Sequence, residues 1–268
     1  MISARVLEDV AFSGASLNEL PFDEMRAVLA TRHVLKVSGL FSADEIRRAR
    51  AIIEQGFRRA DDRSHDPADS DAIKQNFQKL TVGGVGGKNV FRVMRTFFNP
   101  IWAPDTFGMR DIFIRLSQFR NRLYGVHDDF AIRGVEDQLW TAARVHQYPL
   151  GGGCMATHHD YLPAHASESL RSYAQVYLPM TQKGIDFETG GAFLIKDGEA
   201  IHYENDCCLG DVLVYDGRIE HGVSDVDPLR LLDLDRFSGR VAAFVTLYRD
   251  LSAAGETYDK FAKDALAT

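Results

Sequence analysis

The sequence has few cysteines and no long apolar run. Its three cysteines, Cys154, Cys207 and Cys208, fit neither a disulfide framework nor a CxxC zinc site. No stretch of about 18 apolar residues is present, which argues against a transmembrane helix. The opening segment MISARVLEDV also lacks the charged and apolar regions of a secretory signal. These absences predict a cytoplasmic protein with no membrane contact.

Dense basic runs and two common catalytic motifs are missing as well. The formal net charge is −7, whereas proteins that bind nucleic acid usually carry a basic face, so no nucleic-acid partner is expected. The glycine-rich segment 83–87 does not match a phosphate-binding loop, because Val82 stands at the first glycine position and Asn89 follows Gly87-Lys88. We predict a hinge or lid there. A serine hydrolase is disfavoured because no GxSxG occurs.

The first half of the chain shows helical patterns. Residues 33–37 predict a short strand, after which Ser42 begins a helix with the Ser-x-x-Glu pattern of a capping box. A second helix is predicted over 106–124, because apolar residues recur on one stripe and Gly125 follows as a stop. The charged segment 60–75 lacks periodicity and predicts a loop.

From about residue 139 onward the pattern changes to short strands. β-Branched and aromatic residues dominate these runs, and Gly, Asp and Pro separate them. The runs cover 141–148, 172–180, 191–195, 211–216 and 239–248. Strands at such spacing indicate a sandwich, a barrel or a jelly roll. The lack of βα alternation disfavours a dinucleotide fold.

These patterns predict one α+β domain over residues 1–268. N-terminal helices would buttress a double-stranded β-helix, the jelly roll of cupin-like proteins. We expect a helix-rich part with lid loops over 33–138, a jelly-roll core with the metal site over 139–250, and a helical tail over 251–268.

The segment 157–161, Thr-His-His-Asp-Tyr, offers metal ligands. Side chains of a strand alternate between its two faces, so His158 and Asp160 are expected to converge while His159 faces away. An HxD pattern by itself is common, and its histidine usually forms ordinary hydrogen bonds. A metal site therefore needs a third ligand from elsewhere in the chain.

Three downstream histidines are candidates for that third ligand. His165 lies in a predicted loop close to the first pair, and His202 follows a turn. His221 comes just after a predicted strand, and a jelly-roll crossing carries that position next to the first strand. We therefore predict His158, Asp160 and His221 as ligands. Two histidines and one carboxylate on one face leave open positions for co-substrate and O₂, as in non-haem iron(II) oxygenases.

Arg240 opens the apolar run 240–248. A lone arginine that enters an apolar strand is costly unless it meets an anion. The sequence leaves two partners open for it: the far carboxylate of 2-oxoglutarate, which a guanidinium grips with two hydrogen bonds, or a carboxylate of the protein. Arg230 and Arg236, in the preceding insert 225–239, compete for the co-substrate role.

These residues resemble the Fe(II)/2-oxoglutarate-dependent dioxygenase superfamily, and within it the phytanoyl-CoA dioxygenase-like branch. The resemblance covers 33–250 and is strongest over 144–161 and 211–248. HHDYL carries the HxD, DVLVYDGRIEHGV carries the distal histidine, and GRVAAFV carries the co-substrate arginine. The insert before Arg240 makes the distance from histidine to arginine longer than is usual in this branch.

A further part of the resemblance precedes the HxD. Members of the superfamily often have a strand reading K/R-x-N-x-Y-P, in which the Asn and the Tyr contact 2-oxoglutarate. This chain has Arg144-Val-His146-Gln-Tyr148-Pro149. The resemblance implies a co-substrate contact for Tyr148, and for His146 in place of the Asn. Related halogenases carry a small residue where this chain has Asp160, which favours oxygen transfer or desaturation over halogenation.

The resemblance implies an enzyme that uses Fe(II), 2-oxoglutarate and O₂. Its expected reaction hydroxylates a C–H bond of a small molecule, amino-acid-derived or another secondary metabolite, and releases succinate and CO₂. Arg92, Arg95 and Arg218 are weaker candidates for contacts with an anionic substrate, because most such arginines only solvate the surface. Two rivals remain: a cupin-like metalloenzyme that does not use 2-oxoglutarate, and a non-enzymatic β-sandwich binding module.

Overall fold

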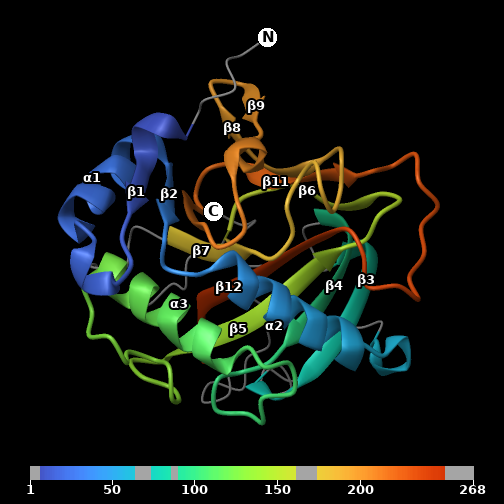
Figure 1. The fold of residues 1–268 in the computed structure, drawn as a ribbon, viewed down its shortest axis with the longest axis horizontal. Coiled ribbons are helices and arrows are strands. Elements are labelled where there is room, and N and C mark those ends of the chain that lie inside the picture. Colours follow the sequence, from blue (N-terminus) through green and yellow to red (C-terminus); the bar gives the residue numbers. More distant parts are fainter. Residues whose placement is uncertain (1–6, 64–73, 86–89, 161–173, 251–268) are drawn as a thin grey trace, which may run out of the picture.

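The strands of this protein pair into a single, strongly curved sheet (Figure 1). The computed structural model describes residues 7–63, 74–85, 90–160 and 174–250. Twelve strands are found within these ranges, and all neighbours run antiparallel except β1 and β2. In the order of their pairing they are β1 (Ala11–Ser13), β2 (Val34–Ser38), β10 (Val212–Asp216), β7 (Ala174–Pro179), β12 (Arg240–Arg249), β5 (Leu139–Tyr148), β4 (Val90–Phe98), β6 (Gly153–His158), β11 (His221–Val226), β8 (Gly191–Lys196) and β9 (Glu199–Ile201), with β3 (Phe77–Val85) paired to β4.

The predicted jelly roll is confirmed. One half consists of β5, β12, β7 and β10, and the other half consists of β6, β11, β8 and β9. In Figure 1, β8 and β11 lie above β7, β12 and β5. The halves face each other across an interior, where the ring of Tyr215 on β10 lies 4.7 Å from that of His221 on β11. Side chains of both halves therefore meet inside the roll.

The hairpin of β3 and β4 joins the two halves, and the sequence patterns did not predict it. The C-terminal part of β4 pairs with β5, and its N-terminal part pairs with β6. Residues 83–85, part of the expected glycine-rich lid, belong to β3, and the rest of that segment lies outside the described residues. Glycines interrupt the alternation of β3, which hides a strand from pattern analysis.

Helices cover the outer face of the first half. They are α1 (Phe22–Arg32), α2 (Ala43–Gly56) and α3 (Arg110–Tyr124), with short 3-10 turns η1 (Glu8–Val10), η2 (Leu17–Glu19), η3 (Arg59–Asp61) and η6 (Tyr203–Asp206). The Ser42 hydroxyl caps α2 as predicted, by accepting the Glu45 N–H at 3.2 Å. Gly125 ends α3 with a φ of 76°. Helix α1 was missed, because only Met25 and Leu29 of it are buried.

No helix in the described ranges is both long enough and apolar enough to cross a membrane. The predicted helical tail over 251–268 lies outside the described residues.

Alternation along β5 and β12 separates the apolar core from the site. Ala143 and Val145 of β5 belong to the core that includes α3, as does Val245 of β12. Because successive side chains point to opposite faces, Arg144 and His146 turn into the interior of the roll. The fold thus places a row of polar side chains opposite the helical layer.

Gly239 sets the start of β12, where Arg240 enters the sheet. Its φ is +84°, and a Cβ at this position would collide with the Tyr148 carbonyl oxygen and lie 2.8 Å from the Leu150 nitrogen. We expect Gly239→Ala to lower the free energy of unfolding by about 2–3 kcal/mol in urea denaturation, since both strain and collision oppose the native backbone. Gly134→Ala is the matched control, because nothing lies within 4 Å of a Cβ there. Equal stabilities of the two variants would contradict this expectation.

Candidate metal centre

Three side chains, two from neighbouring strands and one from the segment that follows β6, converge at one end of the roll. β6 ends at His158, and Asp160 follows it, held by its backbone N–H, which donates to the Gly217 carbonyl oxygen at 2.8 Å. His221 begins β11 and stands opposite His158 in the strand register. The ligand atoms of these three residues all lie within 4.8 Å of one another. The structure thus brings together the three residues predicted as ligands.

The backbone fixes which ring nitrogens face the shared centre. His158 Nδ1 lies 2.8 Å from the Ala156 carbonyl oxygen, and His221 Nδ1 lies 2.8 Å from that of Ile219. A carbonyl oxygen can only accept a hydrogen bond, so both Nδ1 atoms carry the proton. Each Nε2 therefore presents a lone pair, which is the form that binds a metal ion.

The centre contains buried polar atoms without hydrogen-bond partners. His221 Nε2 lies 3.4 Å from Asp160 Oδ2, yet neither atom forms a hydrogen bond among the described residues. His158 Nε2 lies 3.8 Å from Asp160 Oδ1. Unsatisfied buried polar groups are costly, and a cation held between two imidazoles and a carboxylate removes that cost. The donor set of this chain therefore fits a divalent transition metal.

The three ligands have different pKa values. Burial, together with the nearby charge of His221, lowers the pKa of His158 to about 4. Burial also lowers the pKa of His221, but the adjacent Asp160 carboxylate outweighs burial and raises it above the ordinary 6.5. For Asp160, burial raises the pKa, but the two histidines overcome this and keep it below 3.8. His158 and Asp160 are thus ready to bind a metal at neutral pH.

These shifts predict a one-proton pH dependence of metal binding. Between about pH 6 and 5 the metal must displace one proton, which His221 carries because its pKa is raised, whereas His158 stays neutral until the pH nears 4. We expect metal affinity to fall about tenfold per pH unit over this range, and more steeply below it. Mn(II) titrations between these pH values measure the slope. A hundredfold loss per unit, or none, would contradict the assignment.

Arg240 has a protein partner. Its side chain is 2% exposed, and its Nε and Nη2 atoms donate to both carboxylate oxygens of Glu204, at 2.6–3.1 Å. Of the two partners that the sequence left open, the structure thus contains the protein carboxylate. Nη1 of Arg240 remains buried without a partner among the described residues. The Tyr148 ring lies 5.1 Å from the guanidinium carbon. One edge of Arg240 is therefore still available to a ligand.

The other predicted co-substrate residues are placed differently. Arg230 is exposed and lies 3.5 Å from Asp227, and Arg236 is exposed as well, so neither competitor enters the interior. His146 is half-buried, its ring packs at a tilt against that of Phe244 with the centroids 4.6 Å apart, and its Nε2 accepts a hydrogen bond from Arg144. Burial and neighbouring arginines keep its pKa well below 6.5. His146 is therefore a neutral interior side chain outside the metal group.

The three arginines proposed for the substrate have separate environments. Arg95 is fully buried, and Asp62 and Gln147 bind it. Arg218 forms an ion pair with Asp216 at 2.6 Å. Arg92 donates a long hydrogen bond of 3.4 Å to the Val90 carbonyl oxygen. Arg92 is thus the one of the three without a carboxylate partner among the described residues.

Two residues of this interior were missed in the sequence. Glu204 lies in the 3-10 turn η6, where nothing in the local pattern signals a buried carboxylate. Arg144 is the first residue of the motif that contains His146 and Tyr148, but the sequence analysis assigned it no role. The K/R position of the K/R-x-N-x-Y-P motif was the sequence feature that could have indicated a role for Arg144.

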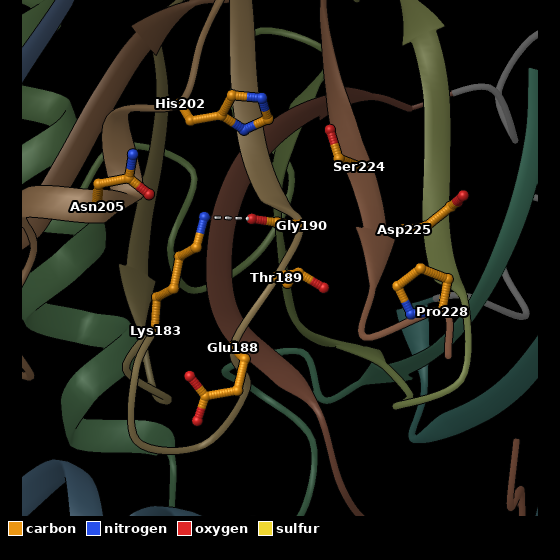
Figure 2. Close-up of a pocket in the computed structure, with 9 residues that line it drawn as sticks. All are labelled: Lys183, Glu188, Thr189, Gly190, His202, Asn205, Ser224, Asp225 and Pro228. Atoms are coloured by element: carbon orange, nitrogen blue, oxygen red, sulfur yellow. Dashed lines mark hydrogen bonds between the residues drawn. The ribbon is translucent and has the colours of Figure 1, made fainter. Parts of the chain in front are cut away.

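A separate surface pocket of about 490 Å³ lies beside β8 and β11 (Figure 2). None of the three candidate ligands lines it. In Figure 2 the Lys183 ammonium points across it to the Gly190 carbonyl oxygen, 2.9 Å away. Its lining is Lys183, Glu188, Thr189, Gly190, His202, Asn205, Ser224, Asp225 and Pro228. His202, one of the histidines weighed as a third ligand, is thus found here and not in the metal group.

No protein-family model matches this chain, and no curated protein matches it in sequence. Solved structures do. A prolyl-4-hydroxylase from Pseudomonas putida matches with a TM-score of 0.50 and 16% identity, covering 85% of this chain and 98% of that one. A prolyl hydroxylase from Trichoplax adhaerens, in complex with a hypoxia inducible factor peptide fragment, matches with a TM-score of 0.51 and 14% identity, covering 87% and 91%.

A third structure has the same fold. It is the non-haem α-ketoglutarate-dependent carbocyclase SnoK from nogalamycin biosynthesis, with a TM-score of 0.50 and 14% identity, covering 88% of each chain. The fold of this chain is therefore the fold of 2-oxoglutarate/iron(II) oxygenases. The predicted cofactors, Fe(II), 2-oxoglutarate and O₂, agree with this fold and with the two-histidine, one-carboxylate group. Membership of the phytanoyl-CoA dioxygenase-like branch stays a prediction.

Proposed function

We propose that this chain is an Fe(II)- and 2-oxoglutarate-dependent oxygenase that hydroxylates a C–H bond of a small molecule in the cytoplasm. The observation that carries the proposal is the group of His158, Asp160 and His221, whose ligand atoms lie within 4.8 Å of one another at the end of a jelly roll. This donor set leaves room for a bidentate co-substrate and O₂ on the same metal ion.

Each part of the interior has a distinct task in this proposal. The three ligands hold iron, and the carbonyl groups of Ala156 and Ile219 keep the histidine rings in the binding orientation. Iron with 2-oxoglutarate and O₂ supplies the oxidant for the C–H bond. The free Nη1 of Arg240, with Tyr148 beside it, holds the far carboxylate of the co-substrate.

The direct test is co-substrate turnover. Purified protein is supplied with Fe(II), 2-oxoglutarate, O₂ and a panel of small metabolites, and succinate and oxidised products are measured by mass spectrometry. We expect succinate formation that depends on iron and rises with one class of metabolite. Product mass separates hydroxylation, which adds one oxygen atom, from desaturation, which removes two hydrogen atoms. No succinate with any member of the panel would remove the proposal.

One observation favours a second candidate, a cupin-like metalloenzyme that does not use 2-oxoglutarate. Glu204 already neutralises Arg240, with two oxygens on one edge of the guanidinium. A protein that never binds a second carboxylate there would need no more than this pair. One measurement distinguishes the two candidates. Absorbance under anaerobic conditions reports whether bound Fe(II) is chelated by 2-oxoglutarate. Fe(II) binding without such chelation supports the second candidate.

A further inference from the structure

Arg144 is a buried cation in the interior of the roll. It is 7% exposed, and no carboxylate among the described residues lies within ion-pair distance of it. Other buried arginines of the sheet are paired, Arg95 with Asp62 and Arg240 with Glu204. A buried charge without a counter-charge is strongly disfavoured. An anionic ligand beside Arg144 would compensate this buried charge.

The guanidinium of Arg144 is held in place with one end left open. Its Nε donates to His146 Nε2 at 3.0 Å, and its Nη1 donates to the Ala142 carbonyl oxygen at 3.1 Å. The rings of Phe244 and Tyr248 flank it, 5.4 and 5.2 Å from its central carbon. Nη2 donates no hydrogen bond to any described residue. A guanidinium fixed in this way loses little entropy when it binds a ligand.

Arg92 adds a second positive charge on the same side of the interior. Arg92 stands opposite Met155 of β6 in the strand register, so the two side chains share a face of the sheet. The sulfur of Met155 lies 3.7 Å from the hydroxyl of Tyr148, which shares its face of β5 with Arg144. Among the described residues, the Arg92 side chain has one hydrogen-bond partner, the carbonyl oxygen of Val90. The carboxylates nearby are committed: Glu204 to Arg240, and Asp160 to the metal group.

The co-substrate cannot satisfy both arginine sites. Arg144 and Tyr148 are four residues apart on one face of β5, which corresponds to about 13 Å along the strand, and Tyr148 stands opposite Arg240 in the register. A molecule of 2-oxoglutarate that chelates the metal through its keto acid end has one free carboxylate. If Arg240 holds that group, a different anion must reach Arg144.

We infer that Arg144, assisted by Arg92, binds a carboxylate of the primary substrate, so that the substrates are small organic acids. A carboxylate matches the fork of a guanidinium, and the flanking rings of Phe244 and Tyr248 favour an apolar body next to it. The inference rests on the proposed function for the position of the metal, but the binding of the acid does not require the metal.

Calorimetry with pairs of acid and amide tests the inference. Acetate, phenylacetate and indole-3-acetate are each titrated into the metal-free protein, and into the protein loaded with Fe(II) and 2-oxoglutarate without O₂, alongside their primary amides. We expect at least one acid to bind about tenfold more tightly than its amide in both forms. Arg144→Met should remove this preference, Arg144→Lys should restore part of it, and Arg92→Met should reduce it several-fold.

The control variant is Arg47→Met, which removes the same charge from the exposed surface of α2. It should keep the full preference for the acid. Three results would overturn the inference. No acid of the panel binds, or acid and amide bind equally well, or the preference for the acid is unchanged in both Arg144→Met and Arg92→Met. The inference would also fall if Arg144→Met weakened the binding of 2-oxoglutarate and not that of the acids.

A parallel measurement keeps the two proposals apart. Chelation of 2-oxoglutarate by Fe(II) gives a visible charge-transfer absorbance, which tests the proposed function. If wild-type protein shows no such band, the proposed function fails, and calorimetry on the metal-free protein still decides whether Arg144 binds acids. If the band forms and no acid binds, only the present inference fails.

Discussion

Asp160→Ala is expected to abolish both iron(II) binding and succinate formation. The substitution removes the carboxylate that faces His158 Nε2 at 3.8 Å and His221 Nε2 at 3.4 Å, and so removes one of three ligands. Loss of residues that merely orient a ligand typically costs 10- to 100-fold in metal affinity, so loss of the ligand itself should cost at least about a hundredfold. Anaerobic Fe(II) titration and succinate assays measure the two effects.

The neighbouring histidine provides the matched control. The ring of His159 points away from the metal group, and its Nδ1 lies 2.8 Å from the Arg218 carbonyl oxygen. It is exposed, so His159→Ala should bind iron and form succinate at close to wild-type levels. His221→Ala should behave like Asp160→Ala. If His159→Ala lost iron while Asp160→Ala kept it, the ligand assignment would be wrong.

The same region shows how the sequence predicted the ligands. Strand alternation led us to expect His158 and Asp160 on one face of a single strand, but β6 ends at His158. Asp160 reaches the centre because its N–H binds the Gly217 carbonyl oxygen in the turn that precedes His221. The residues were predicted correctly, while the reason for their convergence lies in a contact between two segments distant in sequence. Local periodicity cannot report such a contact.

The limits of prediction elsewhere have similar causes. The jelly roll was predictable from residue 139 onward, because its strands alternate and have clear turn residues between them. β3 was not, since glycines break its alternation. The role of Glu204 was not predictable either, because it depends on contacts that are distant in sequence. Its partner Arg240 lies on β12, and at Gly191 a Cβ would lie 2.9 Å from the Glu204 carboxylate. Burial of a carboxylate is a tertiary property that a short polar turn does not show.

Arg240→Met is the variant with the second-largest expected effect, and it acts on stability and on co-substrate binding together. It leaves the Glu204 carboxylate buried without its cation, although Tyr177 and the Ala192 N–H still donate to it. Removing one partner of a buried ion pair costs about 3–5 kcal/mol of the free energy of unfolding. We expect a loss of this size in urea denaturation of the metal-free protein.

The same variant should raise the concentration of 2-oxoglutarate that half-saturates turnover. A charge-assisted hydrogen bond from Nη1 is lost, and such bonds contribute about 1.5–3 kcal/mol, which corresponds to roughly ten- to a hundredfold. Succinate formation against 2-oxoglutarate concentration measures the change. An unchanged requirement would mean that Arg240 pairs only with Glu204.

The double variant Arg240→Met/Glu204→Leu separates the two effects. Replacing a buried ion pair by apolar residues of similar volume is often neutral for stability, so the double variant should recover most of the lost free energy of unfolding. It still lacks Nη1 of Arg240, the atom that has no partner among the described residues of the wild-type structure. We therefore expect the raised 2-oxoglutarate requirement to persist in the restabilised protein. If stability and co-substrate affinity recovered together, the effect of Arg240→Met on turnover would come from misfolding, and Arg240 would have no direct contact with 2-oxoglutarate.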